Sequence, residues 1–337
     1  MTTFHHALRR RFVFRSLAAW LAAGSMATAA MPVALAQEGS AAAASRTPTG
    51  KVPAAVSVLS IVEHPSLDAL RDGLHDELKD AGYQDGKSLH WAYQSAQGNQ
   101  GTAVQIARKF VGDRPDVIVP IATPAAQAVV SATHQIPVVY NAITDPIAAQ
   151  IVKSMAPSGT NVTGVSDKLV ADRQVAFIKR VVPDVKRVGI IYSPAEANSV
   201  SATREMKVAL EKQGISLVEV AAPRSIDVGQ AAQRLVGKVD VIYTSNDNNV
   251  ISAYESVIKV ANAAKIPLIC ADRSSVQRGA TGAMAIDYYR MGRQTGRMVL
   301  RILNGEKPGD IASETSDRLD ITLNLDAARR QGATLSP

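Results

Sequence analysis

Short apolar segments alternate with amphipathic segments from Val52 onward, and this alternation restricts the possible folds more than any other feature of the sequence. The apolar segments are rich in β-branched residues, which is typical of buried strands, and they cover 55–61, 88–94, 116–122, 136–142, 187–193, 215–220, 239–245 and 266–271. The segments between them have helical spacing, as Leu67, Leu70 and Leu74 illustrate, and they cover 67–81, 101–112, 124–133, 170–182, 199–213, 227–237, 248–264 and 288–304. Such alternation predicts an α/β protein with parallel sheets and helices on both faces of each sheet.

The strand–helix units fall into two groups. Four units precede residue 150 and four follow residue 185, so we expect two lobes, each with a doubly wound parallel sheet. The pattern breaks at 159–167 and again at 279–287, and we interpret both regions as crossovers between the lobes. A strand at 319–325 and a helix at 326–331 would make the third crossing. The predicted domains are lobe 1, 52–165 plus 285–317, and lobe 2, 166–284 plus 318–337.

The N-terminus has the pattern of a secretory signal peptide. Arg9–Arg11 and Arg15 precede an Ala-rich apolar stretch that ends in Ala34-Leu35-Ala36, a small-x-small cleavage pattern. We therefore assign 1–36 as a signal peptide and 37–51, rich in Ala, Ser and Thr, as a flexible tether. The arginines fit both twin-arginine and general export, and the sequence leaves that choice open. The mature protein is expected to be soluble and periplasmic.

Several classes of function are excluded by what the sequence lacks. Loss of the four signal-peptide arginines reduces the formal net charge of +7 by four, so the basic character is weak evidence for nucleic-acid binding. Cys270 is the sole cysteine, and no HxxxH, HExxH, CxxC, GxGxxG or GxxxxGK[ST] pattern occurs, so we expect neither a metal nor a cofactor. We also find no constellation of nucleophile, base and acid, so we do not expect an enzyme.

Ligands of doubly wound sheets bind outside the carboxyl ends of the strands, so the residues that follow each strand are the candidates for a site. In the first half, Thr123 is predicted to cap a helix whose first residue is Pro124. The free N–H groups of that helix N-terminus would suit a carboxylate, although a plain helix cap is an equal alternative. Asp145, followed by a proline, is interpreted as a structural cap, with a position facing the hinge or the ligand as the alternative.

Polar residues are denser after the strands of the second half. Glu196, Asn198 and Ser199 lie together, and one cap would explain only one of them. The stretch 245–249 holds a serine, an aspartate and three asparagines, and Asp247 within it is our best candidate for the partner of a buried ammonium group. A polar turn is the alternative. Asp272 could face the same cleft or pair with the arginine that follows it.

These junctions resemble the tryptophan/tyrosine-type family of ABC-transporter substrate-binding proteins, a branch of the type I periplasmic binding fold. The matching segments, in order, are HPSLDALRDGL, DVIVPIATPAAQA, IPVVYNAITDPIAAQIV, NVTGVSD, VGIIYSPAEANS, YTSNDNNVISA, IPLICADRSSVQRGA and DYYRMGRQTGRMVLRILNGEKP. The resemblance implies two lobes, joined by three crossovers, that close on a ligand. It also implies an ABC permease and its ATPase as partners of a monomeric binding protein.

Carried over residue by residue, the resemblance implies a set of ligand-facing groups. They are Thr123, the amide of Ala125, Asn141, Asn198, Ser199, Asp247, Asn248 and Asp272. The implied ligand is an L-amino acid, with aromatic amino acids as the narrower expectation. Sugar sites place aromatic faces against the sugar ring, and aromatic residues make up only 4% of this chain. A periplasmic sensor that uses the same fold without transport remains the alternative function.

Overall fold

The computed structural model describes residues 48–316 and 318–334. Ser45–Pro337 form one compact unit, and all the helices and strands named below lie in it. The predicted signal peptide, 1–36, and most of the predicted tether, 37–51, lie outside the described residues. Within the described part of the chain, no helix is both long enough and apolar enough to span a bilayer.

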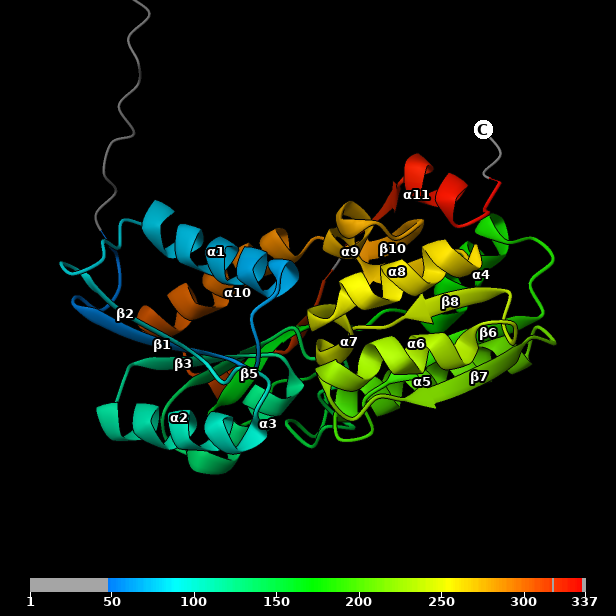
Figure 1. The fold of residues 1–337 in the computed structure, drawn as a ribbon. Helices are drawn as coiled ribbons and strands as arrows, with labels where there is room; N and C mark the ends of the chain where they lie inside the picture. Colours follow the sequence, from blue (N-terminus) through cyan, green and yellow to red (C-terminus); the bar gives the residue numbers. More distant parts are fainter. Residues whose placement is uncertain (1–47, 317, 335–337) are drawn as a thin grey trace, which may run out of the picture. The chain divides into compact units, whose positions relative to one another are not determined.

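The first sheet has the strand order β11-β5-β4-β3-β1-β2, and all its strands run parallel. Its strands are β1 (Ala54–Ser60), β2 (Leu89–Ser95), β3 (Val117–Ile121), β4 (Val138–Asn141), β5 (Val162–Ser166) and β11 (Glu314–Thr315). Its helices are α1 (Pro65–Asp80), α2 (Gln100–Asp113), α3 (Thr123–Ala132) and α10 (Tyr288–Leu303). In Figure 1, α1 and α10 cover one face of this sheet, and α2 and α3 cover the other.

The second sheet has the order β12-β10-β9-β8-β6-β7, and only β12 runs antiparallel to its neighbour. Its strands are β6 (Arg187–Tyr192), β7 (Ser216–Ala221), β8 (Val241–Thr244), β9 (Leu268–Asp272), β10 (Gly282–Ile286) and β12 (Leu319–Leu323). The α-helices are α4 (Ala171–Val181), α5 (Ala197–Glu211), α6 (Val228–Leu235), α7 (Asn248–Ser252), α8 (Tyr254–Ala264), α9 (Arg273–Arg278) and α11 (Leu325–Arg330). Two 3₁₀ turns, η1 (Ser225–Asp227) and η2 (Pro308–Asp310), complete the described elements. Apolar residues of α6 and α8 form one core of this sheet, and those of α4 and α5 form another.

The chain passes between the two sheets three times, after β5, after β10 and after β11. The regions 159–167 and 279–287 were predicted to be irregular crossovers. In the structure each of them contains a buried strand, β5 in the first and β10 in the second. The glycines in these two segments interrupt the apolar pattern, so the sequence analysis did not recognise the strands. A Cβ at Gly164 would lie 2.2 Å from the carbonyl oxygen of Tyr140, so close packing rather than a turn requires this glycine. Because both sheets lie in one compact unit, the proposed residue boundaries of the two lobes remain a prediction.

Helices α1 and α10 pack against each other through glycines. A Cβ at Gly292 would lie 2.0 Å from the carbonyl oxygen of Leu70, and one at Gly73 would lie 2.1 Å from that of Tyr289. The two backbones therefore approach more closely than any other residue would allow. Gly292 and Gly296, four residues apart in α10, therefore lie at a site of close helix packing.

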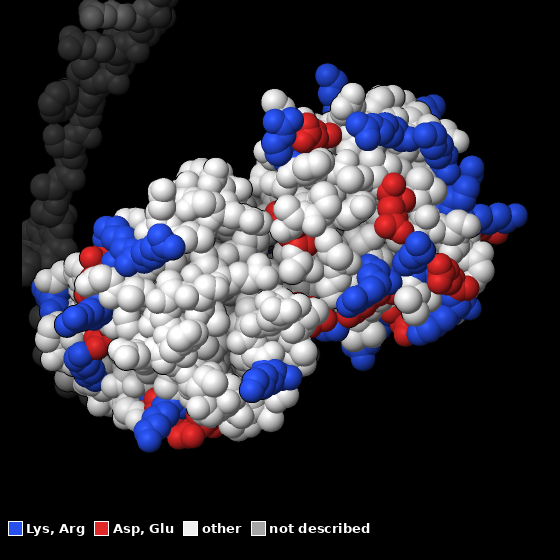
Figure 2. Space-filling model, turned by 90° about the horizontal axis from the view of Figure 1, so that it is seen from below, with Lys and Arg blue, Asp and Glu red and all other residues white. Residues whose placement is uncertain are grey.

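Charged side chains do not gather by sign on the face that Figure 2 shows. Lysines, arginines and acidic residues are intermixed on this face, and a broad uncharged area lies between the charged groups on one half of it. A nucleic-acid surface would present an extended basic patch, and this face of the described residues presents none.

Candidate ligand-binding site

The carboxyl ends of the two sheets lie against each other. Gln100 in α2 donates a hydrogen bond of 3.2 Å to the carbonyl oxygen of Ala195, which follows β6. Ser201 in α5 donates one of 3.2 Å to Asp145, which follows β4. All eight predicted ligand-facing residues are buried at this junction. Both sheets change winding direction here, at the β1–β3 and β6–β8 pairs, where ligands of such sheets bind.

Helix α3 begins one residue earlier than predicted, at Thr123 itself. The capping position is occupied by Ala122, with φ 72° and ψ 157°, which has no side-chain oxygen to offer the helix. Ala126 donates the first backbone hydrogen bond of the helix, to the carbonyl oxygen of Ala122 (3.1 Å). The N–H groups of Thr123 and Ala125 therefore have no partner within the helix or elsewhere in the described residues, and Pro124 has no N–H. The Thr123 hydroxyl is buried without a hydrogen-bond partner among the described residues.

Asn141 ends the neighbouring strand and is fully buried, yet neither atom of its side-chain amide has a partner in the described structure. The next residue, Ala142, has φ 56°, so two adjacent strands both end at an alanine in the left-handed region. Such positions in non-glycine residues cost about 1–3 kcal/mol each and are concentrated at functional sites. An unsatisfied amide, hydroxyl and helix N-terminus thus meet at the ends of β3 and β4.

The opposite side of the site is built on the start of α5. Asn198 donates hydrogen bonds to Glu196 (3.1 Å) and to the carbonyl oxygen of Asn246 (2.8 Å), while its own side-chain oxygen has no partner among the described residues. Asn248 donates a 2.6 Å hydrogen bond to the same carboxylate of Glu196. The predicted residues Asn198 and Asn248 are therefore brought together, and Glu196 links them.

The carboxylate of Asp247 is surrounded by hydrogen-bond donors of the protein itself. Its carboxylate accepts hydrogen bonds from the Ser193 N–H (2.6 Å), the Ser193 hydroxyl (2.9 Å), the Ser199 hydroxyl (2.6 Å) and the Val250 N–H (2.9 Å). Both oxygens are fully used, so the predicted direct contact with an ammonium group has no free acceptor. Asp247 and Ser199 instead fasten β6, α5 and α7 together.

Asp272 caps α9 and uses one oxygen for all its hydrogen bonds. Oδ1 accepts from the Ser66 hydroxyl (2.8 Å), the Ser274 hydroxyl (2.6 Å) and the Ser275 N–H (2.9 Å). The Ser66 bond reaches across from α1, so Asp272 both lines the junction and helps to close it. The alternative pairing with Arg273 is not found within the described residues.

Asp167 is a buried residue that the sequence analysis did not select. It accepts hydrogen bonds from Thr144 (2.8 Å), Asn246 (2.9 Å) and Tyr288 (2.8 Å), and thereby ties the end of β5 to the second sheet. Burial raises the pKa of its carboxyl group. Its position directly after a strand was the available signal, but that strand was not recognised.

The buried charged side chains at the junction are acidic, apart from the titratable His64. Asp167, Glu196, Asp247 and Asp272 are all buried, and within the described residues none forms an ion pair with lysine or arginine. Burial lowers the pKa of His64 to about 4, which keeps its imidazole neutral near pH 7. Such an environment favours a ligand with a cationic group.

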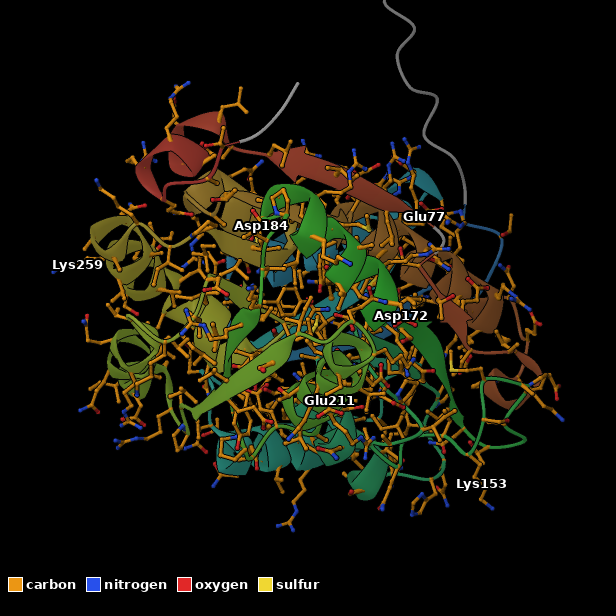
Figure 3. All side chains as sticks on the ribbon, turned by 90° about the vertical axis from the view of Figure 1, so that its right-hand side faces the viewer. Glu77, Lys153, Asp172, Asp184, Glu211 and Lys259 are labelled. Carbon is orange, nitrogen blue, oxygen red and sulfur yellow. The ribbon has the colours of Figure 1, made fainter. Side chains whose placement is uncertain are left out.

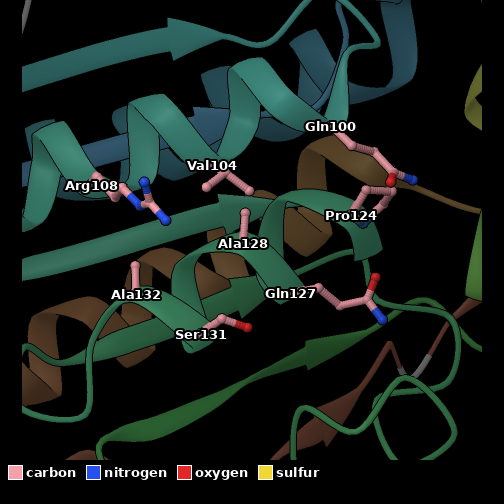
Figure 4. A pocket seen from close by; sticks show the side chains of 8 residues that line it. All are labelled: Gln100, Val104, Arg108, Pro124, Gln127, Ala128, Ser131 and Ala132. Carbon is pink, nitrogen blue, oxygen red and sulfur yellow. The ribbon is translucent and has the colours of Figure 1, made fainter.

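Two cavities lie close to the junction. One, of about 30 Å³, is lined by Thr144, Ser245, Asn246 and neighbouring side chains, and it has room for a water molecule. The other is a surface groove of about 270 Å³ between α2 and α3, shown in Figure 4. The groove includes Pro124 but none of the eight predicted residues, so it is separate from the candidate site. No cluster of three or more metal-ligating side chains occurs within 48–316 and 318–334.

Comparison with known proteins identifies the family. The family model described as ABC transporter substrate binding protein matches residues 55–337. The chain therefore belongs to the ABC transporter substrate-binding protein family. Its function is substrate binding rather than catalysis, as the sequence analysis expected.

A curated relative of this substrate-binding protein is the tyrosine-binding protein of Clostridioides difficile (strain R20291). The two are 39% identical over 81% of this chain and 79% of the relative. The solved structure of a domain in complex with L-Trp from Streptococcus pneumonia has 34% identity and a TM-score of 0.81, covering 84% of this chain and 96% of that one. These matches confirm the predicted type I periplasmic binding fold.

A second solved structure concerns the conformation. The ligand-free, open structure of a substrate-binding protein with adhesive properties from Clostridium difficile is 38% identical, with the same coverage of 84% and 96%, but its TM-score is 0.65. At similar identity and equal coverage, the present structure thus resembles the L-Trp complex more than the open form. The direct hydrogen bonds across the junction agree with this.

Proposed function

We propose that this protein is the exported, monomeric, periplasmic solute-binding component of an ABC importer, and that it binds an L-amino acid, aromatic ones in particular, between the ends of its two sheets. The ABC permease and its ATPase would be its partners. The signal-peptide pattern at 1–36 supports export, and the family supports coupling to transport.

The observation that carries this proposal is the uncapped, buried N-terminus of α3. Thr123 is 1% exposed, and its N–H, its hydroxyl and the N–H of Ala125 lack protein partners in the described structure. Buried donors without partners are destabilising, and a helix N-terminus carries partial positive charge. A ligand carboxylate would satisfy all three donors at once, with the Asn141 amide beside it.

The remaining predicted residues suit the other end of an amino acid. Asn198, Asn248 and Asp272 present amide and carboxylate oxygens in an acidic, buried environment, which favours an ammonium group. The relatives named for tyrosine and solved with L-Trp support an aromatic side chain. A ligand that contacts both sheets would stabilise the closed arrangement by its higher affinity for that arrangement, without any chemical step.

A thermal-shift and calorimetry panel tests the ligand. L-tyrosine and L-tryptophan are expected to raise the melting temperature, because ligand at a hundredfold excess over Kd adds about 2.7 kcal/mol. Tyramine and tryptamine lack the carboxylate and are expected to bind at least tenfold more weakly. Binding of tryptamine as tight as that of tryptophan, or a response to sugars alone, would overturn the proposal.

Thr123→Val tests the carboxylate site itself. Valine keeps the shape of threonine but removes the hydroxyl, so affinity for the amino acid is expected to fall about tenfold. Ser131→Ala is the matched control, because it removes an exposed hydroxyl from the last turn of the same helix (Figure 4). Loss of labelled amino-acid uptake in cells without this protein, restored by the wild-type chain, would test the coupling to transport.

A further inference from the structure

We propose that Glu196, a candidate from the strand-end pattern that is absent from the ligand-facing set implied by the resemblance, supplies the negative charge that holds the ligand's α-ammonium group. The inference rests on the proposed function, because it concerns one end of the same amino acid. It also assigns amino-acid specificity to a residue of the second sheet, opposite the carboxylate site on the first.

Within the described structure, Glu196 accepts hydrogen bonds through only one of its two carboxylate oxygens. Oε2 accepts hydrogen bonds from the Asn198 side chain (3.1 Å), the Asn248 side chain (2.6 Å) and the Asn248 N–H (3.3 Å). Within the described structure, Oε1 receives none of these bonds. The side chain is 6% exposed, so a carboxylate oxygen remains available inside a buried environment.

The nearest acidic alternatives are less suited to the task. Asp247 uses both oxygens within its own sheet, and Asp167 also uses both, in bonds to Thr144, Asn246 and Tyr288. Among the described residues Oδ2 of Asp272 accepts no hydrogen bond, but the bond from Ser66 to Oδ1 gives Asp272 a role in joining the sheets. Glu196 is the one of the four whose bonds are made only by the amides that surround it.

A second observation points independently to a donor-rich ligand group at this place. Asn198 is 4% exposed, and its side-chain Oδ1 is buried without a partner in the described structure. This amide touches Glu196 through its nitrogen. An ammonium group carries three N–H donors and no acceptor, so it can satisfy both oxygens together.

The position of Glu196 relative to the carboxylate site fits a zwitterion. Glu196 precedes α5, whose first residue, Ala197, packs against the core of the first sheet. Helices α3 and α5 are in contact, and Ala195, the residue before Glu196, accepts a hydrogen bond from Gln100 in the first lobe's α2. An amino acid placed between them would turn its carboxylate to α3 and its ammonium to Glu196.

The titration of Glu196 supplies an additional readout. Burial, together with the charge of Asp247, raises the pKa of Glu196 to about 7. Asp247, which precedes α7, is the titratable side chain that faces it, while Asn198 and Asn248 provide the amides around it. Pairing with an ammonium group would favour the ionised form and release a proton near pH 7.

The test measures binding of L-tyrosine and L-tryptophan, and of their analogues without the amino group, 3-(4-hydroxyphenyl)propanoate and indole-3-propanoate. Glu196→Gln is expected to weaken binding of the amino acids at least tenfold and that of the analogues by no more than about twofold. The matched control is Glu211→Gln, at the exposed end of the same helix, labelled in Figure 3. It is expected to bind all four compounds like the wild type.

A measurement on the wild-type protein does not depend on the variant folding. Calorimetry at pH 7 in phosphate and in Tris is expected to show net proton release with the amino acids and none with the analogues. Equal binding by Glu196→Gln and wild type, or no proton release, would overturn the assignment, as would a selective loss of amino-acid binding in Asp272→Asn alone. In each case tight binding of L-tyrosine or L-tryptophan by the wild type would leave the proposed function standing; failure of the wild type to bind any amino acid would end both.

Discussion

The hydroxyl of Ser66, at the start of α1, donates a 2.8 Å hydrogen bond to Oδ1 of Asp272, at the end of β9, across the junction between the two sheets. The two residues are 206 positions apart in the sequence. The same hydroxyl also lies 2.7 Å from that of Ser274. The contact joins α1, which packs on the first sheet, to the end of a strand of the second sheet, so it helps to hold the two sheets together at this junction.

Ser66→Ala is expected to weaken amino-acid binding by a factor of about ten, because a hydrogen bond to a charged group contributes about 1.5–3 kcal/mol and here it favours the closed state. Calorimetry would measure the affinity, and small-angle scattering of the ligand-free protein would show a larger radius of gyration. Ser131→Ala again serves as a control. If neither affinity nor radius changes, the Ser66–Asp272 bond does not contribute to closure.

Asp247→Asn is expected to reduce stability more than it changes ligand selectivity. The carboxylate accepts four hydrogen bonds in the core of the second sheet, so the loss in free energy of unfolding should be about 3 kcal/mol. Urea unfolding would measure it. Asp287→Asn, at a half-buried cap that accepts one backbone bond from Arg290, should cost little, because asparagine caps a helix about as well as aspartate does. A selective loss of amino acids against their deaminated analogues in Asp247→Asn would restore Asp247 as the ammonium partner.

Ala122→Gly is expected to raise the free energy of unfolding by about 0.5–1 kcal/mol. The φ of 72° and ψ of 157° at Ala122 belong to a region that glycine adopts without strain, and the relief should exceed the entropy that glycine adds to the unfolded chain. Ala128→Gly, inside the same helix, should have the opposite sign and cost about 1 kcal/mol. Destabilisation by both variants would show that Ala122 is not strained.

Gly292→Ala should destabilise the protein by 2 kcal/mol or more, about the cost of overpacking, because the new Cβ would lie 2.0 Å from the Leu70 carbonyl oxygen. Gly112→Ala offers the matched control, since the space around Gly112 in α2 is open, and it should be neutral or stabilising by up to about 1 kcal/mol. The denaturant midpoint of Gly292→Ala should therefore lie well below that of Gly112→Ala, and equal midpoints would refute close packing of α1 against α10.

The pH dependence of stability should reveal Glu196 in the ligand-free protein. Its pKa is raised from 4.5 to about 7 in the folded state, so the folded protein binds more protons between these values. The contribution of Glu196 to stability is therefore full below pH 4.5 and is lost as pH rises through 7. Relative to wild type, Glu196→Gln should be more stable at pH 8 than at pH 5, as urea unfolding at both values would measure. The pKa of His64 is shifted in the opposite direction, but His64 is present in both the wild type and the variant. Its contribution to the difference in stability therefore cancels.

Much of the fold could be predicted because hydrophobic periodicity is a local property. The apolar runs around Val117–Ile121 and Val241–Thr244 have no alternative to burial, and their alternation with helices requires parallel sheets. The strands Val162–Ser166 and Gly282–Ile286 were not predicted. Their glycines are required by close contacts with residues distant in sequence, such as the contact of Gly164 with Tyr140. Local patterning has no access to such contacts.

The sequence by itself determined the class of fold, the edges of the sheets at which we propose that the ligand binds, and the polar residue types that gather there. All of these follow from the order of residues along each strand and helix. The tertiary structure decided which polar atoms remain free. In the sequence, Asp247 and Glu196 are equivalent carboxylates. In the described structure, both oxygens of Asp247 accept hydrogen bonds, from Ser193, Ser199 and Val250. Glu196 accepts hydrogen bonds through Oε2 alone. Hydrogen bonds are directional and saturable, so the availability of a side chain depends on neighbours that only folding brings within reach.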